Sequence, residues 1–439
     1  MFRVYFYNLL RRYLSILIRP GDRVVEIDPA NTLLVASMAD GRLATLDEEM
    51  SCFSTSEAHL PLSEGSTYAP HYIVLGGNIH YERDVQAVLA RVRSLCTAHT
   101  RLVITYYSAA WRPLVKLATF LGLRHKTAET NWLSHEDIFN LLLLEDFEPI
   151  KREGRIIFPV YIPLVSAFLN RFVAPLPFFR ALTLVNILVA RPLVRPKDTR
   201  KSVSIVVPAR NEAGNIAAIV ERIPVLSEED EIIFVEGHSS DRTWAEILHV
   251  QALYAGERRI LACRQNGKGK GDAVRMGFSV AKNDILAILD ADMTVAPEDL
   301  PRFHQALCDD KGEFINGSRL VYPMEKKAMR FLNMLGNKFF AAGFSFILGQ
   351  RFKDTLCGTK VISRENYHRL AANRDYFGDF DPFGDFDLIF GAARMGLKIV
   401  EVPIHYRERT YGDTNIARWR HGALLLAMLI FAARRLKFV

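Results

Sequence analysis

The stretch Ile285-Leu286-Ala287-Ile288-Leu289-Asp290-Ala291-Asp292 decides the fold and points to the chemistry of this chain. Its first five residues form a continuous apolar run, which is typical of a strand buried on both faces of a parallel sheet. The run passes directly into two carboxylates two residues apart. At a strand end that turns, both can approach one divalent cation, which prefers oxygen ligands and shares them with substrate phosphates. The simpler alternative is a solvated turn.

Strands and helices alternate around this stretch. Short apolar runs predict strands at residues 203–207, 231–235, 260–263 and 284–289. Helical spacing predicts helices at residues 212–223, 241–255 and 272–281. Such alternation is typical of an α/β domain with a doubly wound parallel sheet, in which ligands bind at the carboxyl ends of the strands.

Three more motifs follow predicted strands and should gather along the same edge of the sheet. They are Val-Val-Pro-Ala-Arg-Asn-Glu (206–212), Val-Glu-Gly-His-Ser-Ser-Asp-Arg-Thr (235–243) and Gly-Lys-Gly-Lys-Gly (267–271). Backbone N–H groups at a glycine-rich helix start suit phosphate, and the lysines add positive charge. The alternatives are a merely flexible glycine loop and, for His238, an ordinary turn residue rather than a base.

Length and composition set the limits of the interpretation. A chain of 439 residues favours two or three domains. The net charge of +7 suits anionic partners such as nucleotide phosphates, lipid phosphates or a membrane surface. The five cysteines are scattered and lack Cys-x-x-Cys spacing, which argues against a zinc site and a disulfide framework and is typical of a reducing cytoplasm.

Four segments are expected along the chain: residues 1–155, 156–200, 201–415 and 416–439. The first shows β-rich runs at residues 23–28, 71–75 and 101–106 and a helical pattern at 81–98. The second is an apolar, proline-containing connector, and the fourth is a basic and apolar C-terminal helix. No stretch reaches the roughly 18–20 uninterrupted apolar residues of a spanning helix. The apolar runs at 156–194 and 423–433 predict either core helices or in-plane membrane anchors.

These motifs resemble those of the family 2 glycosyltransferases of GT-A fold, and most of all the dolichol-phosphate mannosyltransferases. Matches continue with Gly317-Ser318-Arg319, Asp354, Cys357-Gly358-Thr359-Lys360, Glu401-Val402-Pro403 and Arg409-Thr410-Tyr411-Gly412-Asp413-Thr414. The resemblance spans about 215 residues and implies a nucleotide-sugar donor and Mg²⁺ or Mn²⁺.

The resemblance also implies roles for individual residues. Asp290 and Asp292 are expected to bridge the metal to the diphosphate, and Thr294 occupies the position of an auxiliary ligand. The nucleotide-binding residues are expected to be Pro208, Ala209, Arg210, Glu212, Glu236, Lys270 and Arg275. Arg319 and Arg330 are expected to hold phosphates, and Asp387 to lie near the acceptor. Arg409 and residues 412–415 are expected to form a loop over the diphosphate.

Residues 20–155 resemble a class I S-adenosylmethionine-dependent methyltransferase, through the three β-rich runs, Asn131-Trp132-Leu133-Ser134 and Phe147-Glu148-Pro149. The turn after the first run reads Asp28-Pro29-Ala30-Asn31, where that family needs Gly-x-Gly so that the backbone can approach the cofactor. We therefore expect a degenerate domain without S-adenosylmethionine; the alternative is an active methyltransferase. The whole chain then has two Rossmann-like doubly wound domains.

The expected function is an inverting, metal-dependent transfer of a hexose from GDP-mannose or a UDP-sugar to a polyprenyl phosphate. A phosphate acceptor needs no strong base, whereas a sugar hydroxyl would need a carboxylate such as Asp387 or Asp385. Transfer to a sugar hydroxyl in polysaccharide or glycolipid synthesis, and a non-catalytic binding or scaffold protein, are the alternatives. We expect a cytoplasmic protein with peripheral contact to the cytoplasmic face of the membrane, and no nucleic acid partner.

Overall fold

The computed structural model describes residues 2–19, 21–27, 41–46, 51–54, 59–61, 69–122, 131–194, 201–321, 331–374, 385–407, 411 and 418–439. The chain divides into two compact units. Unit 1 comprises residues 1–194 together with the C-terminal residues 433–439, and unit 2 comprises residues 195–432.

Unit 1 is built on an eight-stranded sheet of order β4-β3-β2-β1-β5-β6-β8-β7. Its strands are β1 (Val24–Ile27), β2 (Gly41–Leu46), β3 (Ser51–Ser54), β4 (His59–Pro61), β5 (Tyr72–Gly76), β6 (Arg101–Tyr107), β7 (Phe147–Arg155) and β8 (Val185–Pro192). Strands β2, β1, β5 and β6 are parallel, whereas β8 is antiparallel to both of its neighbours. The three strands expected from residues 23–28, 71–75 and 101–106 are thereby confirmed as β1, β5 and β6.

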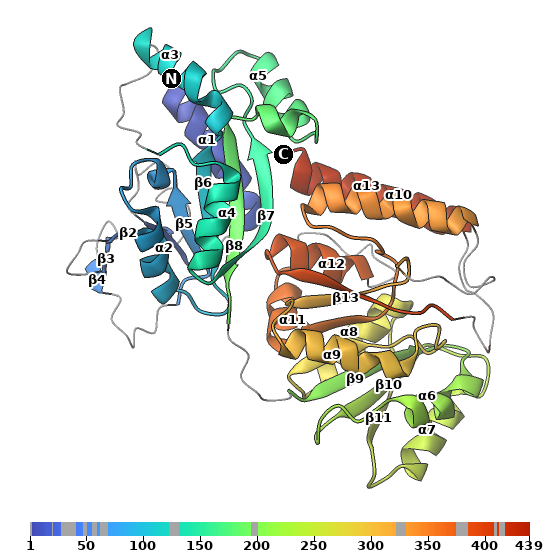
Figure 1. Ribbon diagram of the computed structural model, residues 1–439. Helices are drawn as coiled ribbons and strands as arrows, with labels where there is room; N and C mark the ends of the chain where they lie inside the picture. The colour runs from blue at the N-terminus through green and yellow to red at the C-terminus, as the bar shows by residue number, and fades with distance from the viewer. Residues whose placement is uncertain are drawn as a thin grey trace. The chain divides into compact units, whose positions relative to one another are not determined.

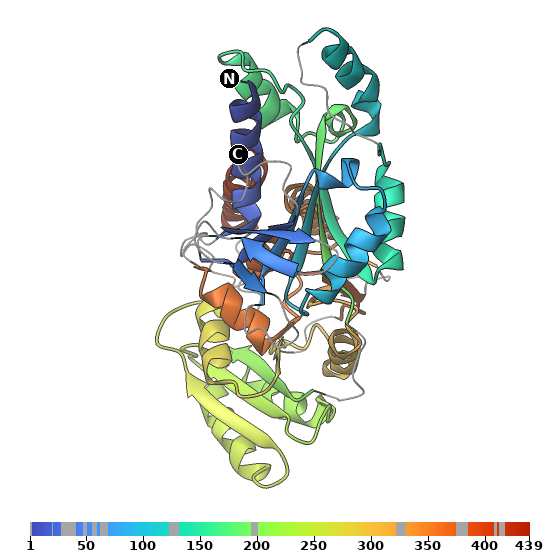
Figure 2. The same ribbon diagram turned by 90° about the vertical axis from the view of Figure 1, so that its left-hand side faces the viewer.

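Helices cover both faces of this sheet. They are α1 (Phe2–Leu17), α2 (Val85–Ser94), α3 (Arg112–Phe120), α4 (His135–Leu144) and α5 (Val165–Phe168), with shorter turns η1 (Asn78–His80), η2 (Ala109–Trp111), η3 (Leu169–Val173), η4 (Phe179–Leu182) and η8 (Ala433–Lys437). Apolar side chains of α2 and α4 pack on one face and those of α1 on the other. Figure 2 shows α1, in dark blue, on one side of the strands, and α2 and α4 on the other.

Unit 2 has a seven-stranded mixed sheet of order β11-β10-β9-β12-β14-β13-β15 (Figure 1). Its strands are β9 (Val203–Ala209), β10 (Glu231–Glu236), β11 (Arg259–Arg264), β12 (Ile285–Ile288), β13 (Phe314–Ser318), β14 (Lys360–Ser363) and β15 (Ile399–Pro403). The first four run parallel, as the alternating pattern predicts. Strand β14 runs antiparallel between β12 and β13, which makes the sheet mixed.

The helices of unit 2 also lie on both faces. They are α6 (Ile216–Arg222), α7 (Thr243–Leu253), α8 (Lys270–Val280), α9 (Leu300–Cys308), α10 (Phe331–Leu348), α11 (Arg364–Ala371), α12 (Asp385–Arg394) and α13 (Arg418–Ala432), with turns η5 (Ala213–Asn215) and η6 (Pro297–Asp299). Side chains of α6, α7 and α9 share one core with alternate residues of the strands. Helix α8 packs on the opposite face, where Gly277 lies against Val206.

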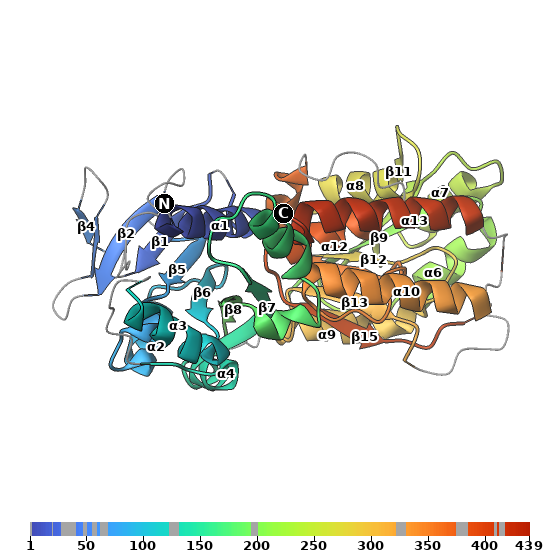
Figure 3. The ribbon, with the colours of Figure 1, turned by 90° about the horizontal axis from the view of Figure 1, so that it is seen from above.

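Two segments differ from the expected boundaries. Residues 156–194 belong to unit 1 and include β8, paired between β6 and β7, so this segment is not a separate connector. Helix α13 belongs to unit 2 and packs beside α10 (Figure 3), whereas the last seven residues belong to unit 1. Both differences arise because an apolar run paired in a sheet or packed in a core has the same composition as a membrane anchor. Among the described residues, no helix has the length and apolar character needed to span a bilayer.

Candidate functional site

The tip of β12 carries the two carboxylates. The strand ends at Ile288, and the chain turns through Asp290 and Asp292 with a bond from the Met293 N–H to the Asp290 carbonyl (3.3 Å). The Thr294 N–H and hydroxyl both donate to Asp292 Oδ1, at 3.1 Å and 2.8 Å. These two bonds fix the orientation of the Asp292 carboxylate at the carboxyl edge of the sheet.

Asp290 is surrounded by cations from three other segments. The Lys270 ammonium, at the start of α8, lies 2.6 Å from Asp290 Oδ1. Burial acts to raise the pKa of Asp290, but the charge and hydrogen bond of Lys270, with the charges of Lys360 and Arg319, lower it overall. Lys360 reaches the site because β14 pairs antiparallel with β12. This pairing places Lys360 opposite Ile288. A carboxylate held ionised among three cations is an arrangement suited to polyphosphate binding.

Gly358, two residues before β14, lies against Asp290 and Lys270. A Cβ at this position would lie 1.9 Å from Asp290 Oδ2 and 2.5 Å from the Lys270 Nζ. Only glycine fits here without displacing one of the two charged groups.

Arg319, directly after β13, is held by a fully buried carboxylate. Its backbone N–H and Nε donate to Asp354 Oδ2 at 3.0 Å and 2.6 Å, and its Nη2 donates to Oδ1 at 2.8 Å. Asp354 is fully buried, and burial opposes its ionisation, yet the Arg319 charge and hydrogen bonds lower its pKa to about 2. The Asn337 amide and the Leu356 N–H also donate to Asp354. The guanidinium of Arg319 is thus fixed in place, with further N–H groups beyond those that Asp354 accepts.

The loops after β9 and β10 are bonded to each other. The Asn211 N–H donates to the Ser239 hydroxyl (3.0 Å), and the Ser240 N–H donates to Asn211 Oδ1 (2.8 Å). The Glu212 N–H donates to the Thr243 hydroxyl (2.9 Å). These bonds hold the motifs at residues 206–212 and 235–243 side by side, as expected from their positions at neighbouring strand ends.

The nucleotide-binding residues expected in these loops have different exposures. Arg210 is exposed, Pro208 is half-buried and Ala209 is buried. Glu212 is buried and accepts a bond from the Asn215 amide (2.7 Å). Glu236 is buried, accepts from the Ser239 N–H and lies 3.7 Å from Arg264.

The glycine-rich motif leads into α8. Gly269, at φ 88°, precedes Lys270 at the first position of the helix, and Arg275 is half-buried one turn later. His238 uses its Nε2 to bond the Gly267 carbonyl (3.0 Å), so it connects two loops. This contact is in line with the interpretation of His238 as a turn residue.

Three non-glycine residues with positive φ lie at the carboxyl edge of the sheet. Asn211, His238 and Met293 have φ of 56°, 58° and 50°. Each follows a different parallel strand, β9, β10 or β12. Non-glycine residues in this region cost energy and cluster at functional sites, so their position agrees with a ligand site at the carboxyl ends of these strands.

Asp387, expected near the acceptor, lies on α12. Its carboxylate accepts from Arg374 Nε at 2.7 Å, and Arg374 lies over the Tyr367 ring. Arg330, Arg409 and residues 412–415 lie outside the described residues, as does the side chain of Asp385.

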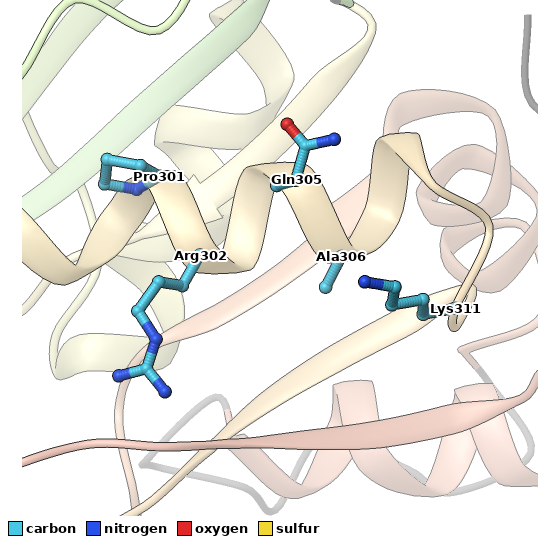
Figure 4. Close-up of a pocket in the computed structure, with 5 residues that line it drawn as sticks. All are labelled: Pro301, Arg302, Gln305, Ala306 and Lys311. Carbon is cyan, nitrogen blue, oxygen red and sulfur yellow. The ribbon is translucent and has the colours of Figure 1, made fainter.

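Sequence reasoning gave no role to Lys360, Gly358 or Asp354, although all three stand in the matched motifs. The antiparallel insertion of β14 brings Lys360 and Gly358 to the site, and that pairing has no local signal in the sequence. A shallow depression on α9 is lined by Pro301, Arg302, Gln305, Ala306 and Lys311 (Figure 4). It includes none of the expected site residues.

Among the residues that the structure describes, no group of three or more His, Cys, Asp or Glu side chains is arranged to hold a metal ion.

Comparisons with known proteins identify the family of this chain. Residues 204–374 match the family model described as glycosyl transferase family 2. The chain is 30% identical over 242 residues to "Glycosyltransferase AglJ" of Haloferax volcanii. This match covers 54% of this chain and 73% of the relative. It is also 30% identical over 228 residues to a dolichyl-phosphate hexose transferase of the same organism, covering 52% and 92%. An undecaprenyl-phosphate 4-deoxy-4-formamido-L-arabinose transferase of Edwardsiella ictaluri is 26% identical over 241 residues, covering 53% and 67%. This chain is a glycosyltransferase and belongs to glycosyl transferase family 2.

Proposed function

We propose that unit 2 transfers a hexose from a nucleotide sugar to a polyprenyl phosphate, with inversion at the anomeric carbon and with a GT-A arrangement of the sheet. The observation that carries the proposal is the 2.6 Å contact of Asp290 with the Lys270 ammonium at the carboxyl edge of the sheet, where the charges of Lys270, Lys360 and Arg319 lower the pKa of Asp290 despite its burial. Two relatives that the chain matches are named for transfer to dolichyl phosphate and undecaprenyl phosphate, which supports the acceptor class.

The residues of the site fit a divalent ion, Mg²⁺ or Mn²⁺, shared with the donor diphosphate. Asp290 and Asp292 would hold it, and Thr294 would act by orienting Asp292 through its hydroxyl bond (2.8 Å). The Lys270 ammonium 2.6 Å from Asp290 shows that this carboxylate already accepts a cation. When bound, the ion neutralises charge that develops on the leaving diphosphate.

The chain's own cations act on the same charge. Lys270 and Arg319 are positioned before the reaction, Lys270 by Asp290 and Arg319 by Asp354. Preorganised cations stabilise a leaving diphosphate without reorganising during the reaction. Pro208, Ala209, Arg210, Glu212, Glu236 and Arg275 would bind the nucleoside, with Arg330 and Arg409 as further phosphate ligands.

A phosphate acceptor is ionised at neutral pH, so its attack needs alignment rather than a general base. The 2.7 Å contact of Asp387 with Arg374 supports this, because the carboxylate is already engaged by a cation. A sugar hydroxyl acceptor in polysaccharide or glycolipid synthesis is the second candidate, and it would require Asp387 or Asp385 as base.

The test is incubation with radiolabelled GDP-mannose or UDP-hexose, Mg²⁺ or Mn²⁺ and polyprenyl phosphate. The expected product is a labelled lipid that resists alkali and is cleaved by mild acid, and it should be absent with Asp292→Asn. Label that appears only in alkali-labile or polysaccharide material would contradict the lipid-phosphate acceptor.

We propose peripheral contact of unit 2 with the cytoplasmic face of the membrane, where a polyprenyl phosphate would be reached. Support comes from α10 and α13, which pack together and expose Leu335, Phe339, Leu426 and Ile430. A vesicle-binding assay with Phe339→Ser and Ile430→Ser tests it; unchanged binding in both variants would contradict a role for these helices.

We also propose that unit 1 is a methyltransferase-like domain that does not use S-adenosylmethionine. The parallel strands β1, β5 and β6 with helices on both faces support the first part. The second part rests on the turn at residues 28–31, which lies outside the described residues. Saturable micromolar binding of labelled S-adenosylmethionine would overturn it.

A further inference from the structure

Unit 1 exposes large apolar side chains in two segments, residues 107–122 and 156–182. The most exposed are Phe120 and Leu164, each 86% exposed, and Phe178, 83% exposed. Leu117, Phe168 and Leu182 are each more than half exposed. We call these two segments together the apolar end of unit 1. So many large apolar side chains exposed in two segments are uncommon on a protein that meets only water.

The two segments are neighbours in space. The Trp111 indole N–H donates to the Leu182 carbonyl (2.9 Å), and the Ser108 N–H donates to the Leu184 carbonyl (2.8 Å). The rings of Tyr5 and Tyr161 lie 5.2 Å apart, which joins the start of α1 to the second segment. Figures 1 and 2 both show α3, α5 and the start of α1 at the same end of unit 1.

The charged side chains of these two segments are all positive. Neither segment contains an Asp or Glu, and Arg112, Lys116 and Arg171 are exposed within them. The C-terminal residues add exposed Arg434 and Arg435. They are held against the second segment by a bond from Arg171 Nε to the Phe438 carbonyl (3.1 Å) and by the Phe172 and Phe438 rings, 6.1 Å apart.

The backbone conformation of the second segment also suggests that its exposed apolar side chains have a binding role. Leu164 has a φ of 62°, a conformation that is costly for a leucine, while its side chain is 86% exposed and adds nothing to the core. Pro163 and Pro177, also exposed, restrict the chain beside Leu164 and Phe178. Loops that expose apolar side chains together with cations match the boundary between headgroups and acyl chains of an anionic bilayer.

We propose that the apolar end of unit 1 docks the protein on an anionic lipid bilayer, with Phe120, Leu164 and Phe178 inserted and Arg112, Lys116 and Arg171 against the headgroups. This site belongs to unit 1, whereas α10 and α13 belong to unit 2, and the proposal does not depend on the transfer reaction. A second copy of the chain is a less suitable occupant, because like charges would face each other across that interface.

Sedimentation with large unilamellar vesicles tests the proposal, using phosphatidylcholine with or without 30% phosphatidylglycerol. The full chain should bind the anionic vesicles and dissociate as salt rises. The triple variant Phe120→Ser, Leu164→Ser, Phe178→Ser should lower the partition coefficient by about 100-fold or more, because each side chain loses apolar burial. The variant Arg112→Gln, Lys116→Gln should weaken the preference for anionic lipid and keep residual binding.

The matched control is Leu143→Ser, Leu144→Ser, two residues in the last turn of α4 that are 56% and 59% exposed. It should bind vesicles as the wild type does. Equal loss in the control and the triple variant, or undiminished binding of the triple variant, would overturn the proposal. So would concentration-dependent self-association that only the triple variant abolishes. The triple variant should hydrolyse a soluble nucleotide sugar at the wild-type rate. Its loss of vesicle binding then reports on docking and leaves the transfer proposal untouched.

Discussion

Replacing Gly358 with alanine adds a single methyl group at the centre of the candidate site. The new Cβ would lie 1.9 Å from Asp290 Oδ2, 2.5 Å from its Cγ and 2.5 Å from the Lys270 Nζ, where ordinary contacts are 3.4–4 Å. One or both charged groups must therefore move by more than about 1 Å. Because Gly358 has no positive φ, the substitution itself introduces no backbone strain.

A misplacement of about 1 Å in a catalytic site costs on the order of 100-fold in rate, which corresponds to about 2.7 kcal/mol of transition-state stabilisation. We therefore expect kcat/KM for hexose transfer to fall about 100-fold in Gly358→Ala. The assay is release of nucleoside diphosphate from the nucleotide sugar at subsaturating donor, with polyprenyl phosphate present.

The matched control is Gly336→Ala on α10, where a Cβ would have no heavy atom within 4 Å. This variant should keep full activity and should be neutral or slightly stabilised, because alanine favours a helix over glycine by about 1 kcal/mol. Thermal unfolding of both variants checks that the fold is intact. If folded Gly358→Ala transferred hexose at more than half the wild-type kcat/KM, the assignment of Asp290 and Lys270 to the site would be refuted.

Three further predictions concern charged residues of the two units. Asp354→Asn should lower the free energy of unfolding in urea at pH 7 by about 3–5 kcal/mol, because it leaves the Arg319 charge unpaired; a loss below 1 kcal/mol would argue against it. Because Arg319 lowers the pKa of Asp354 to about 2 despite burial, the stability difference between wild type and variant should shrink as pH falls from about 4 to about 2. Burial lowers the pKa of Lys437 to about 8. The free energy of unfolding of the wild type relative to Lys437→Met should therefore rise between pH 8 and about 10.5. If that difference did not change with pH, it would contradict the buried ammonium. Asp387→Asn should keep kcat for polyprenyl phosphate within about tenfold of wild type, because an ionised acceptor needs no base; a loss of about 100-fold or more in a folded variant would favour a hydroxyl acceptor.

Local patterns in the sequence predict the parts of this fold that depend on neighbouring residues. The apolar run ending in Asp290 and Asp292 predicts β12 and its turn, and the motif at 267–271 predicts the start of α8. In each case the signal and the structure lie within about ten residues of each other, and buried parallel strands have a continuous apolar pattern.

The parts that the sequence did not predict depend on long-range pairing. Strand β14 reaches β12 from more than 70 residues away in the chain, and it alone brings Lys360 and Gly358 to Asp290. Strand β8 was expected within a connector, since its apolar run has no feature that distinguishes a sheet partner from a membrane anchor. The ion pair of Glu153 with Lys437 (3.7 Å) likewise joins residues that no local pattern relates.

We propose that Asp290 and Asp292 hold a divalent ion shared with the donor diphosphate. It is tested most directly by titrating Mn²⁺ into the protein with saturating GDP or UDP, following free Mn²⁺ by electron paramagnetic resonance. We predict Mn²⁺ binding that requires the nucleotide and that weakens by at least about 10–100-fold in Asp290→Asn and in Asp292→Asn. Folded variants that bind Mn²⁺ and nucleotide as tightly as the wild type would contradict the claim.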